Sequence, residues 1–347
     1  MDRLGYYVPQ TLLRHEGISA RAAATLNAWR RGGVEPVLVS EPPTWPFDTT
    51  LSLLRNHLRS DADAARRVER MIMDGELDCV IVRLLLPTRS WLTVAATGRL
   101  ALEIHSPLWR PESARDLPRT ALGTFVGGRL VARAKAGFFI TKELQDLQEY
   151  RKVADPFVLG NGIGLGTPFT APMNARARVG LVVGSTSRWQ GIDRFAAWAD
   201  ALPKHEFVVI APASLEGEVR SAIRSEHLQF VPTTDLSSYH SALQTLDAAV
   251  SGLAYDRRKM AEAAPLKVRD YVNGAIPTIL LYTDTNLSTV DDPAILHLPR
   301  WDDFTAVDQW LQTVRGQRVS ETARQAISID AIERKRLHHL GMGQQPS

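Results

Sequence analysis

The segment 261–281, AEAAPLKVRDYVNGAIPTILL, has residue types and a spacing that could bind a phosphate. Pro265 suits the first turn of a helix, where its missing N–H is not needed, and Gly274 suits the end of the same helix. The free N–H groups at a helix start, including that of Leu266, attract anions together with the helix dipole. Lys267, in the first turn, adds a full positive charge. We therefore expect a phosphate site at the start of this helix.

Two acidic residues, Glu262 and Asp270, lie on either side of that helix start. They are eight positions apart, so one precedes the helix, the other lies within it, and both can face one ligand. Carboxylates accept hydrogen bonds from neighbouring hydroxyl groups. A pair of them around a phosphate site fits a sugar nucleotide, in which hydroxyl-rich groups flank a diphosphate. A surface helix with ordinary capping acids fits the same spacing equally well.

The elements that must position these residues are strands and helices in alternation. Short apolar runs alternate with longer amphipathic ones along the chain, a pattern typical of parallel sheets covered by helices. We expect strands over 4–9, 34–40, 78–84, 100–106, 136–141, 156–160, 177–185, 206–212, 228–232, 247–253 and 276–282. A helix is expected over 19–31, because Ala22, Leu26 and Trp29 recur there at helical spacing.

The length of the chain indicates two domains, since 347 residues exceed one ordinary compact core. Glycine, proline and small residues accumulate over 160–178, which indicates a linker. We expect a doubly wound α/β domain over 1–165, a linker over 166–177, a second doubly wound domain over 178–315, and a C-terminal helix and tail over 316–347. Two domains imply a cleft between them.

Composition excludes several classes of protein. Hydrophobic residues make up 44% and charged residues 23% of the chain, which argues against disorder. Cys79 is the only cysteine, which excludes an internal disulfide framework and a thiolate zinc site and favours a reducing cytoplasm. The net charge of +3 gives no bulk attraction for nucleic acid. The start of the chain does not resemble a signal peptide, and no apolar run approaches about 18 residues. We expect a cytoplasmic protein.

The richest basic patch lies over 110–135. It combines arginines with apolar residues: Arg115, Arg119, Arg129 and Arg133 with Trp109, Leu117, Phe125 and Leu130. Such a patch is either a solvated helix face or a contact with an anionic surface or acceptor. The second interpretation would allow peripheral association with the inner face of the membrane.

The first segment resembles a motif of the retaining glycosyltransferases of family 4. That motif has a Glu, seven residues, a second Glu, and then a glycine and a proline before an apolar strand. Glu262, Asp270, Gly274 and Pro277 match it, with Asp in place of the second Glu. The resemblance implies a GT-B fold, in which two Rossmann-like domains face a central cleft. It also implies that Glu262 contacts the donor sugar and Asp270 the ribose.

The resemblance extends over nearly the whole chain. His105 follows an expected strand at the carboxyl edge of the sheet, where open α/β sheets bind ligands, and family members carry a histidine near the transferred sugar at the corresponding place. A structural histidine is the alternative. Gly17 corresponds to the family's first glycine loop and would let the backbone approach a donor phosphate or the acceptor; an ordinary turn glycine fits as well. Thr141 and Asn161 are expected to be architectural.

The segment VVGSTSRWQGIDRF resembles the family's phosphate-binding loop, with Gly184 at its first glycine. Many relatives place Arg directly after that glycine and Lys before the second one. Ser185 and Gln190 occupy those positions here, and neither can neutralise a diphosphate. We expect Lys267 and Arg188 to supply the missing positive charge.

Pro232 and Thr233 follow the strand after which the family places its nucleotide-base pocket. The base would be read largely by backbone groups, so its identity stays open. There is no Asp-x-Asp pair suited to holding a metal on the diphosphate. We therefore expect a metal-independent reaction without a cofactor, with a nucleotide sugar as donor and no nucleic-acid partner.

The resemblance implies a glycosyltransferase of glycan or polysaccharide biosynthesis that retains the anomeric configuration. The acceptor stays open among saccharides, lipid-linked intermediates and other molecules. Two other functions fit the same residues. One is a sugar-nucleotide 2-epimerase, which shares the architecture and needs no acceptor. The other is a non-catalytic scaffold that binds a nucleotide sugar.

Overall fold

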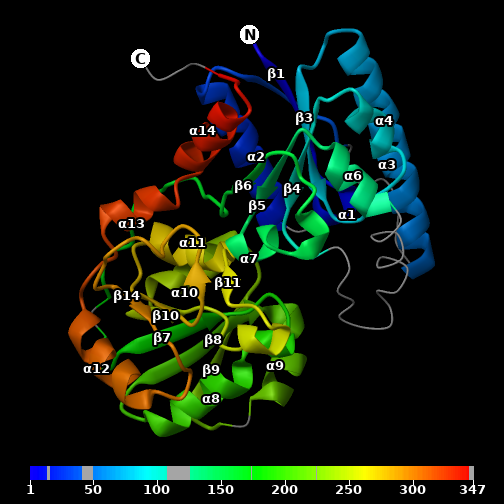
Figure 1. Ribbon diagram of the computed structural model, residues 1–347. Helices are drawn as coiled ribbons and strands as arrows, with labels where there is room; N and C mark the ends of the chain where they lie inside the picture. The colour runs from blue at the N-terminus through cyan, green and yellow to red at the C-terminus, as the bar shows by residue number, and fades with distance from the viewer. Residues whose placement is uncertain (14–15, 41–49, 108–125, 173, 224, 344–347) are drawn as a thin grey trace. The chain divides into compact units, whose positions relative to one another are not determined.

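The computed structural model describes residues 1–13, 16–40, 50–107, 126–172, 174–223 and 225–343 (Figure 1). The chain divides into two compact units. Unit 1 comprises Met1–Gly162 and Ile329–Ser347, and unit 2 comprises Ile163–Ser328. Each unit is a doubly wound α/β domain with a six-stranded parallel sheet, which confirms that part of the predicted fold.

The sheet of unit 1 has the strand order β2-β1-β3-β4-β5-β6, and all neighbouring strands are parallel. Its strands are β1 (Arg3–Tyr7), β2 (Glu35–Leu38), β3 (Cys79–Leu84), β4 (Leu100–Ile104), β5 (Ala136–Phe139) and β6 (Pro156–Val158). Each falls within or next to a predicted range. The order reverses between β1 and β3, which makes their carboxyl ends the place where an open sheet of this type binds ligands.

Helices cover both faces of this sheet (Figure 1). They are α1 (Gln10–Leu13), α2 (Glu16–Arg31), α3 (Thr50–Met73), α4 (Trp91–Ala96), α6 (Gly128–Arg133), α7 (Lys142–Gln145), the short 3₁₀ helix η3 (Gln148–Tyr150) and α14 (Ile329–His339). Side chains of β3 alternate between the faces: Val80 and Val82 pack on the side of α3 and α4, and Cys79 and Ile81 on the side of α2 and α14. The predicted helix over 19–31 is confirmed within α2.

The C-terminal helix α14 belongs to unit 1, although the rest of the chain from 163 to 328 forms unit 2. Ile332 and Leu337 of α14 are buried in the same core cluster as Trp29 of α2. A side chain at Gly32 would meet the Leu337 methyl group at 2.7 Å, and one at Gly162 would meet the backbone of α14 at 2.8 Å. A residue larger than glycine at position 32 or 162 would therefore collide with α14.

The sheet of unit 2 has the strand order β14-β12-β10-β7-β8-β9, again all parallel. Its strands are β7 (Arg178–Val182), β8 (Glu206–Pro212), β9 (Leu228–Thr233), β10 (Ala248–Val250), β12 (Thr278–Leu280) and β14 (Ile295–His297). A separate two-stranded sheet pairs β11 (Glu262–Ala263) with β13 (Thr283–Asp284). The sequence did not predict β11, β13 or β14, which are too short to show a periodicity.

Helices flank this sheet as well: η4 (Arg188–Gln190), α8 (Ile192–Ala201), η5 (Ala213–Leu215), α9 (Glu216–Ala222), α10 (Leu236–Gln244), η6 (Tyr255–Arg258), α11 (Leu266–Asn273), α12 (Phe304–Val314) and α13 (Glu321–Ala326). The sheet divides the core of unit 2 into two clusters. The residues 166–177, predicted as a linker, lie within unit 2.

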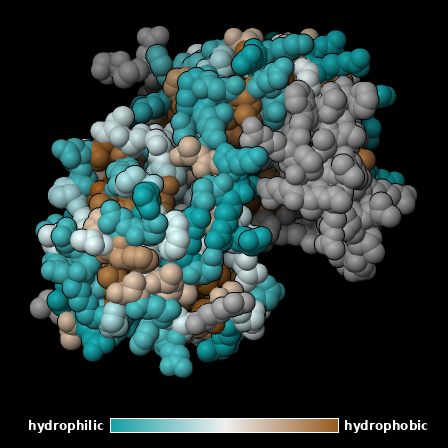
Figure 2. All heavy atoms as spheres, turned by 60° about the horizontal axis from the view of Figure 1, so that its bottom comes forward, coloured by the Kyte–Doolittle hydropathy of each residue, from teal (hydrophilic) through white to brown (hydrophobic). Residues whose placement is uncertain are grey.

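Few large hydrophobic side chains are exposed among the described residues. On the face shown in Figure 2 most of the described residues are hydrophilic, and the hydrophobic ones form small groups. The large hydrophobic side chains that are exposed are scattered along the chain: Met1, Leu38, Leu58, Met73 and Leu236. Within the described ranges, no helix combines the length and the hydropathy that a membrane span requires.

Candidate functional site

In unit 2 the strand order reverses between β7 and β10, so a ligand is expected beyond the carboxyl ends of these two strands. β7 leads into Gly184, which is exposed, and Ser185, which is half-buried. Tyr271 of α11 lies behind this point and joins the two strands. The Val182 N–H donates to the Tyr271 hydroxyl at 3.0 Å, and that hydroxyl donates to the Val250 carbonyl at 3.4 Å. The position of α11 against the strand ends is thus fixed by hydrogen bonds.

Helix α11 begins at Leu266, and Pro265 precedes it in an extended conformation as the N-cap. The sequence placed Pro265 within the first turn, so the helix begins one position later than predicted. The physical argument holds for Leu266 and Lys267, whose N–H groups precede the first hydrogen bond of the helix, whereas the Val268 N–H donates to the Pro265 carbonyl at 3.2 Å. The N–H groups of Leu266 and Lys267 and the positive end of the helix dipole favour an anion at this end of α11.

The Lys267 side chain extends from the first turn of α11 to the carboxyl end of β7. Its ammonium group donates to the Val182 carbonyl at 2.9 Å and to Gln190 Oε1 at 2.7 Å. Within the described part of the chain it forms no ion pair. Desolvation by the surrounding protein lowers the pKa of Lys267 to about 7. Lys267, predicted to compensate for the uncharged Gln190, is thus in direct contact with that residue.

Asp270 lies one turn further along α11. The Tyr239 hydroxyl of α10 donates to Asp270 Oδ2 at 2.9 Å. Burial raises the pKa of Asp270 to about 6, and the hydrogen bond from Tyr239 opposes that rise. The sequence did not predict Tyr239, because nothing in its neighbourhood indicates which element it packs against.

The remaining predicted residues of unit 2, apart from Arg188, differ in their exposure. Glu262 is half-buried in β11 and stands opposite Thr283 of β13. Pro232 and Thr233 end the edge strand β9; Pro232 is exposed and Thr233 is buried. The role of these three residues in donor binding stays a prediction.

Arg188 begins η4 and is exposed. Its guanidinium makes no hydrogen bond or ion pair with a described residue, so the structure does not join it to Lys267. Arg188 lines a groove of about 470 Å³ together with Asp193, Ser221 and Arg257. Arg257 is engaged within this groove by two hydrogen bonds to the Asp193 carboxylate, at 2.9 and 2.6 Å. The predicted charge compensation by Arg188 stays untested.

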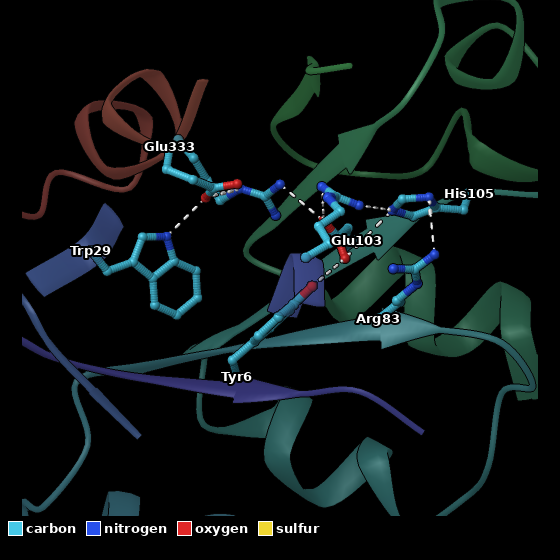
Figure 3. A network of polar contacts seen from close by, with 8 residues as sticks. Tyr6, Trp29, Arg83, Glu103, His105 and Glu333 are labelled. Atoms are coloured by element: carbon cyan, nitrogen blue, oxygen red, sulfur yellow. Dashed lines mark hydrogen bonds and ion pairs between the residues drawn. The ribbon is translucent and has the colours of Figure 1, made fainter. Parts of the chain in front are cut away.

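In unit 1, His105 follows β4 directly at the carboxyl edge of the sheet, as predicted (Figure 3). Arg83 Nη2 lies 3.4 Å from His105 Nδ1, and Arg21 Nη1 and Glu103 Oε2 each lie 3.4 Å from His105 Nε2. Burial, and then the charge of Arg83, lower the pKa of His105 to about 3. The imidazole is therefore neutral at physiological pH. Arg83 can only donate and the Glu103 carboxylate can only accept, so Nδ1 accepts from Arg83 and the ring proton belongs on Nε2, facing Glu103. Arg21 then donates to Glu103 and not to the ring.

Glu103 is the centre of a buried polar network behind His105 (Figure 3). It accepts hydrogen bonds from the Tyr6 hydroxyl at 2.8 Å, from Arg21 at 3.1 Å and from Arg336 of α14 at 2.9 Å. Burial alone would raise the pKa of Glu103, but the two guanidiniums hold it well below its usual range. Glu103 is thus a permanent carboxylate inside the unit.

Glu333 of α14 extends the network. It accepts from Trp29 Nε1 at 2.8 Å and pairs with Arg336 Nε at 2.9 Å. Sequence reasoning missed the whole network. A signal was present, because Arg83 and Glu103 interrupt the apolar runs CVIVRL and LALEI, and a charged residue inside a buried strand requires a partner.

Gly17 lies in the first turn of α2 and is exposed. Thr141 caps α7, where its hydroxyl accepts from the Leu144 N–H at 3.2 Å, as an architectural residue would. Of the predicted basic patch, Arg129 and Arg133 are exposed and Leu130 is buried in the core. The other members of the patch lie outside the described residues: Trp109, Arg110, Arg115, Leu117, Arg119 and Phe125.

Among the described residues, no group of three or more His, Cys, Asp or Glu side chains is arranged so that it could hold a metal ion. The single cysteine, Cys79, is buried in the core of unit 1, and burial raises its pKa to about 11.

Comparisons with known proteins address the fold. No family model matches the chain, and no curated protein matches it in sequence. Among solved structures, a glycosyltransferase from Rickettsia africae ESF-5 aligns with a TM-score of 0.60 and 13% identity, over 97% of each chain. An alpha-glucosyltransferase in complex with UDP and a 13-mer DNA containing an HMU base aligns with a TM-score of 0.55 and 10% identity, over 99% of this chain and 96% of the other.

A UDP-GlcNAc 2-epimerase from Neisseria meningitidis bound to UDP-GlcNAc aligns with a TM-score of 0.50 and 11% identity, over 98% of this chain and 99% of the other. Identities this low establish the fold alone. They confirm the predicted GT-B architecture of two Rossmann-like domains, whereas membership of family 4 stays a prediction. Transferases and epimerases both occur among these structures, so the fold does not choose between the two activities.

Proposed function

We propose that this chain is a glycosyltransferase that moves a sugar from a nucleotide-sugar donor to an acceptor, and that the start of α11 in unit 2 binds the donor's diphosphate. The observation that carries this proposal is the Lys267 ammonium group at the strand ends of β7 and β10. It has neutral hydrogen-bond acceptors and no ion pair within the described residues. A desolvated ammonium without a counter-charge is costly, and a diphosphate supplies that charge.

The same arrangement suits the chemistry. Breaking the bond between the anomeric carbon and the diphosphate leaves positive charge on the sugar and negative charge on the leaving group. Lys267 and the free N–H groups at the start of α11 stabilise that negative charge, and they do so most strongly where water is excluded. Gln190 Oε1 holds the ammonium group in place at 2.7 Å. The donor is bound in this way without a divalent metal, and the resemblance to family 4 favours retention of configuration.

The acids beside this site bind the hydroxyl groups of the donor. Asp270, held by the Tyr239 hydroxyl, accepts from the ribose, and Glu262 accepts from the sugar. Gly184 and Ser185 line the diphosphate. The pKa of about 6 leaves Asp270 ionised at neutral pH, as an acceptor must be.

Outside the α11 region, Pro232 and Thr233 border the base, and Arg188 is the candidate second cation. In unit 1, Gly17 and the neutral His105 contact the acceptor or the transferred sugar. The reaction belongs to glycan or polysaccharide biosynthesis in the cytoplasm. The acceptor is a saccharide, a lipid-linked intermediate or another hydroxyl-bearing molecule.

A sugar-nucleotide 2-epimerase is the second candidate, because the Neisseria meningitidis epimerase shares the fold over nearly the whole chain. An epimerase needs the same diphosphate site but no acceptor. Product analysis separates the two. A transferase releases nucleoside diphosphate when an acceptor is present, whereas an epimerase returns the nucleotide sugar with one inverted carbon. A chain that binds the nucleotide sugar and forms neither product is a non-catalytic scaffold.

Binding is the first test. Isothermal calorimetry in EDTA with UDP-, GDP- and ADP-sugars should show binding of one base class. Lys267→Met should weaken that binding by about ten- to a hundredfold, the loss expected for one hydrogen bond to a charged group. Lys204→Met is the matched control, since Lys204 lies in the same unit and pairs with Asp308 at the surface. Equal affinities of the Lys267→Met variant and the unmodified protein would show that the diphosphate binds elsewhere.

A further inference from the structure

The buried network of unit 1 carries an excess of positive charge. Three guanidiniums, those of Arg21, Arg83 and Arg336, face two carboxylates, those of Glu103 and Glu333. His105 is neutral and adds nothing to this balance. The described residues of the network therefore leave one positive charge without a counter-charge.

The excess charge belongs to Arg83. Glu103 pairs with Arg21 at 3.1 Å and with Arg336 at 2.9 Å, whereas Arg83 forms no ion pair with a described residue. Its direct contacts are neutral groups, the imidazole of His105 at 3.4 Å and the hydroxyl of Tyr6, and the Glu103 carboxylate attracts it from beyond ion-pair distance. Burial lowers the pKa of Arg83, although the guanidinium stays protonated at any physiological pH. A desolvated cation of this kind is stabilised when an anion binds it.

The location of Arg83 makes such an anion accessible. Arg83 is the penultimate residue of β3, at the carboxyl edge and beside the point where the strand order of unit 1 reverses. This is where open parallel sheets bind their ligands. Arg83 is partly exposed, and the His105 side chain is 13% exposed, whereas those of Arg21 and Glu103 are 3% and 2% exposed. A ligand can therefore reach Arg83 and His105 but not the groups behind them.

We propose that Arg83, supported by His105, forms a binding site for an oxyanion on the acceptor substrate, a phosphate or carboxylate group. The planar guanidinium offers paired N–H donors, which match the geometry of both groups. Its contact with Nδ1 of His105 fixes the direction of the guanidinium (Figure 3). This proposal rests on the proposed function, since it assigns the anion to the acceptor. The donor's diphosphate has its own cation, Lys267, in unit 2.

The structure thereby narrows the class of acceptor. An acceptor that carries a phosphate ester or a carboxylate would bind through this group, and its hydroxyl would be held at a fixed distance from it. Neutral acceptors would leave the Arg83 charge uncompensated and would bind less tightly.

The test follows the His105 imidazole by nitrogen-15 NMR while inorganic phosphate is titrated at constant ionic strength. His105→Gln identifies the signal among the nine histidines of the chain. We expect a saturable shift of the His105 signal in the unmodified protein. Arg83→Gln should raise the half-saturating concentration at least tenfold. Arg89→Gln is the matched control, because Arg89 is exposed and follows the same strand. A His105 signal that ignores phosphate, or responds equally in the Arg83→Gln variant, overturns the proposal.

Further arms of the same titration separate the possible failures. If Arg83→Gln does not fold, Arg83→Lys replaces it. The half-saturating phosphate concentration should then rise two- to tenfold, because the paired donors of the guanidinium are lost. An unchanged half-saturating concentration overturns the proposal. Glycerol 3-phosphate should bind at least as tightly as inorganic phosphate, and rejection of the ester would show a site for free anions only. Lys267→Met should leave the His105 response intact, so loss of the donor site and loss of the Arg83 site are observed independently.

Discussion

Binding of the nucleotide sugar should take up a proton through Lys267. In the ligand-free protein, desolvation lowers the pKa of Lys267 to about 7. A diphosphate placed against the ammonium group favours its charged form and raises this pKa again. At a pH above 7, the lysine of the free protein is neutral and that of the complex is protonated. The proton that makes up the difference comes from the solvent.

The size of the uptake follows from that pKa. With a pKa near 7, roughly 0.9 of the free molecules carry a neutral lysine at pH 8 and about 0.5 at pH 7, so these are the expected numbers of protons that Lys267 takes up per ligand. The affinity should fall about fivefold between pH 7 and pH 8 for the same reason. In the absence of ligand, the unfolded chain binds the extra proton between about pH 7 and pH 10, so this lysine makes the free energy of unfolding rise with pH across that window.

Calorimetry in buffers of different ionisation enthalpy measures the uptake directly. The apparent binding enthalpy at pH 8 should change with the buffer enthalpy with a slope of about 0.9. A nucleotide sugar is the right ligand, because its diphosphate does not titrate near neutral pH. Asp270, with a pKa of about 6, is already ionised at pH 8 and does not interfere. Lys204→Met should keep the slope, and Lys267→Met should abolish it. Binding with a slope near zero in the unmodified protein would refute the assignment of the diphosphate to Lys267.

Three further predictions follow from contacts within the units. Tyr239→Phe should raise the pKa of Asp270 above 6, because it removes the hydrogen bond that opposes the effect of burial. Carbon-13 NMR of the carboxyl group measures this pKa, and a lowered value would contradict the prediction. Gly274→Ala should lower the free energy of unfolding of unit 2 by about 1–3 kcal/mol, because the new methyl group would lie 2.5 Å from the Phe169 ring. Urea denaturation measures this loss. A variant of unchanged stability would show that the Phe169 ring moves aside without cost. Glu103→Gln should lower the free energy of unfolding of unit 1 by about 3–5 kcal/mol, since it leaves the buried Arg21 without a carboxylate and leaves Arg336 with Glu333 alone. A loss under about 1 kcal/mol in the same assay would mean that the network is hydrated.

Much of the fold could be predicted because parallel strands covered on both faces are continuous apolar runs. The run EFVVIAP over 206–212 coincides with β8, and CVIVRL coincides with β3. Strand β14 could not be predicted, because its three residues, ILH, show no pattern. The return of α14 to unit 1 could not be predicted either. That helix is recognisable by its periodicity, but its partners Trp29 and Glu103 lie more than two hundred positions away in the sequence.

The end of α11 shows how a correct prediction can rest on a different cause. The helix ends before Gly274 as expected, but Gly274 has a right-handed conformation. Ala275 adopts the left-handed conformation instead, with φ of 57°, and its N–H and that of Ile276 bond back to Val272 and Tyr271. A glycine is required at 274 because of the Phe169 ring, a tertiary contact that the sequence does not display.

In unit 2 the resemblance to family 4 indicated which residues to compare. The resemblance implied that Ser185 and Gln190 stand where many relatives have cations, and Lys267 and Arg188 were predicted to compensate. Of these two, Lys267 contacts Gln190 directly. The site around Arg83 was not accessible in this way. Whether Arg83 keeps an unpaired charge depends on which arginines pair with Glu103. Those pairs form only when β3, β4, α2 and α14 pack together.

A crystal structure of the protein with the nucleotide sugar that it binds, grown in EDTA, tests the central claim most directly. We predict a diphosphate oxygen within about 3 Å of Lys267 Nζ, with the start of α11 directed at the same phosphate. A nucleotide whose diphosphate lies away from α11, with Lys267 still bonded only to Val182 and Gln190, would contradict the account.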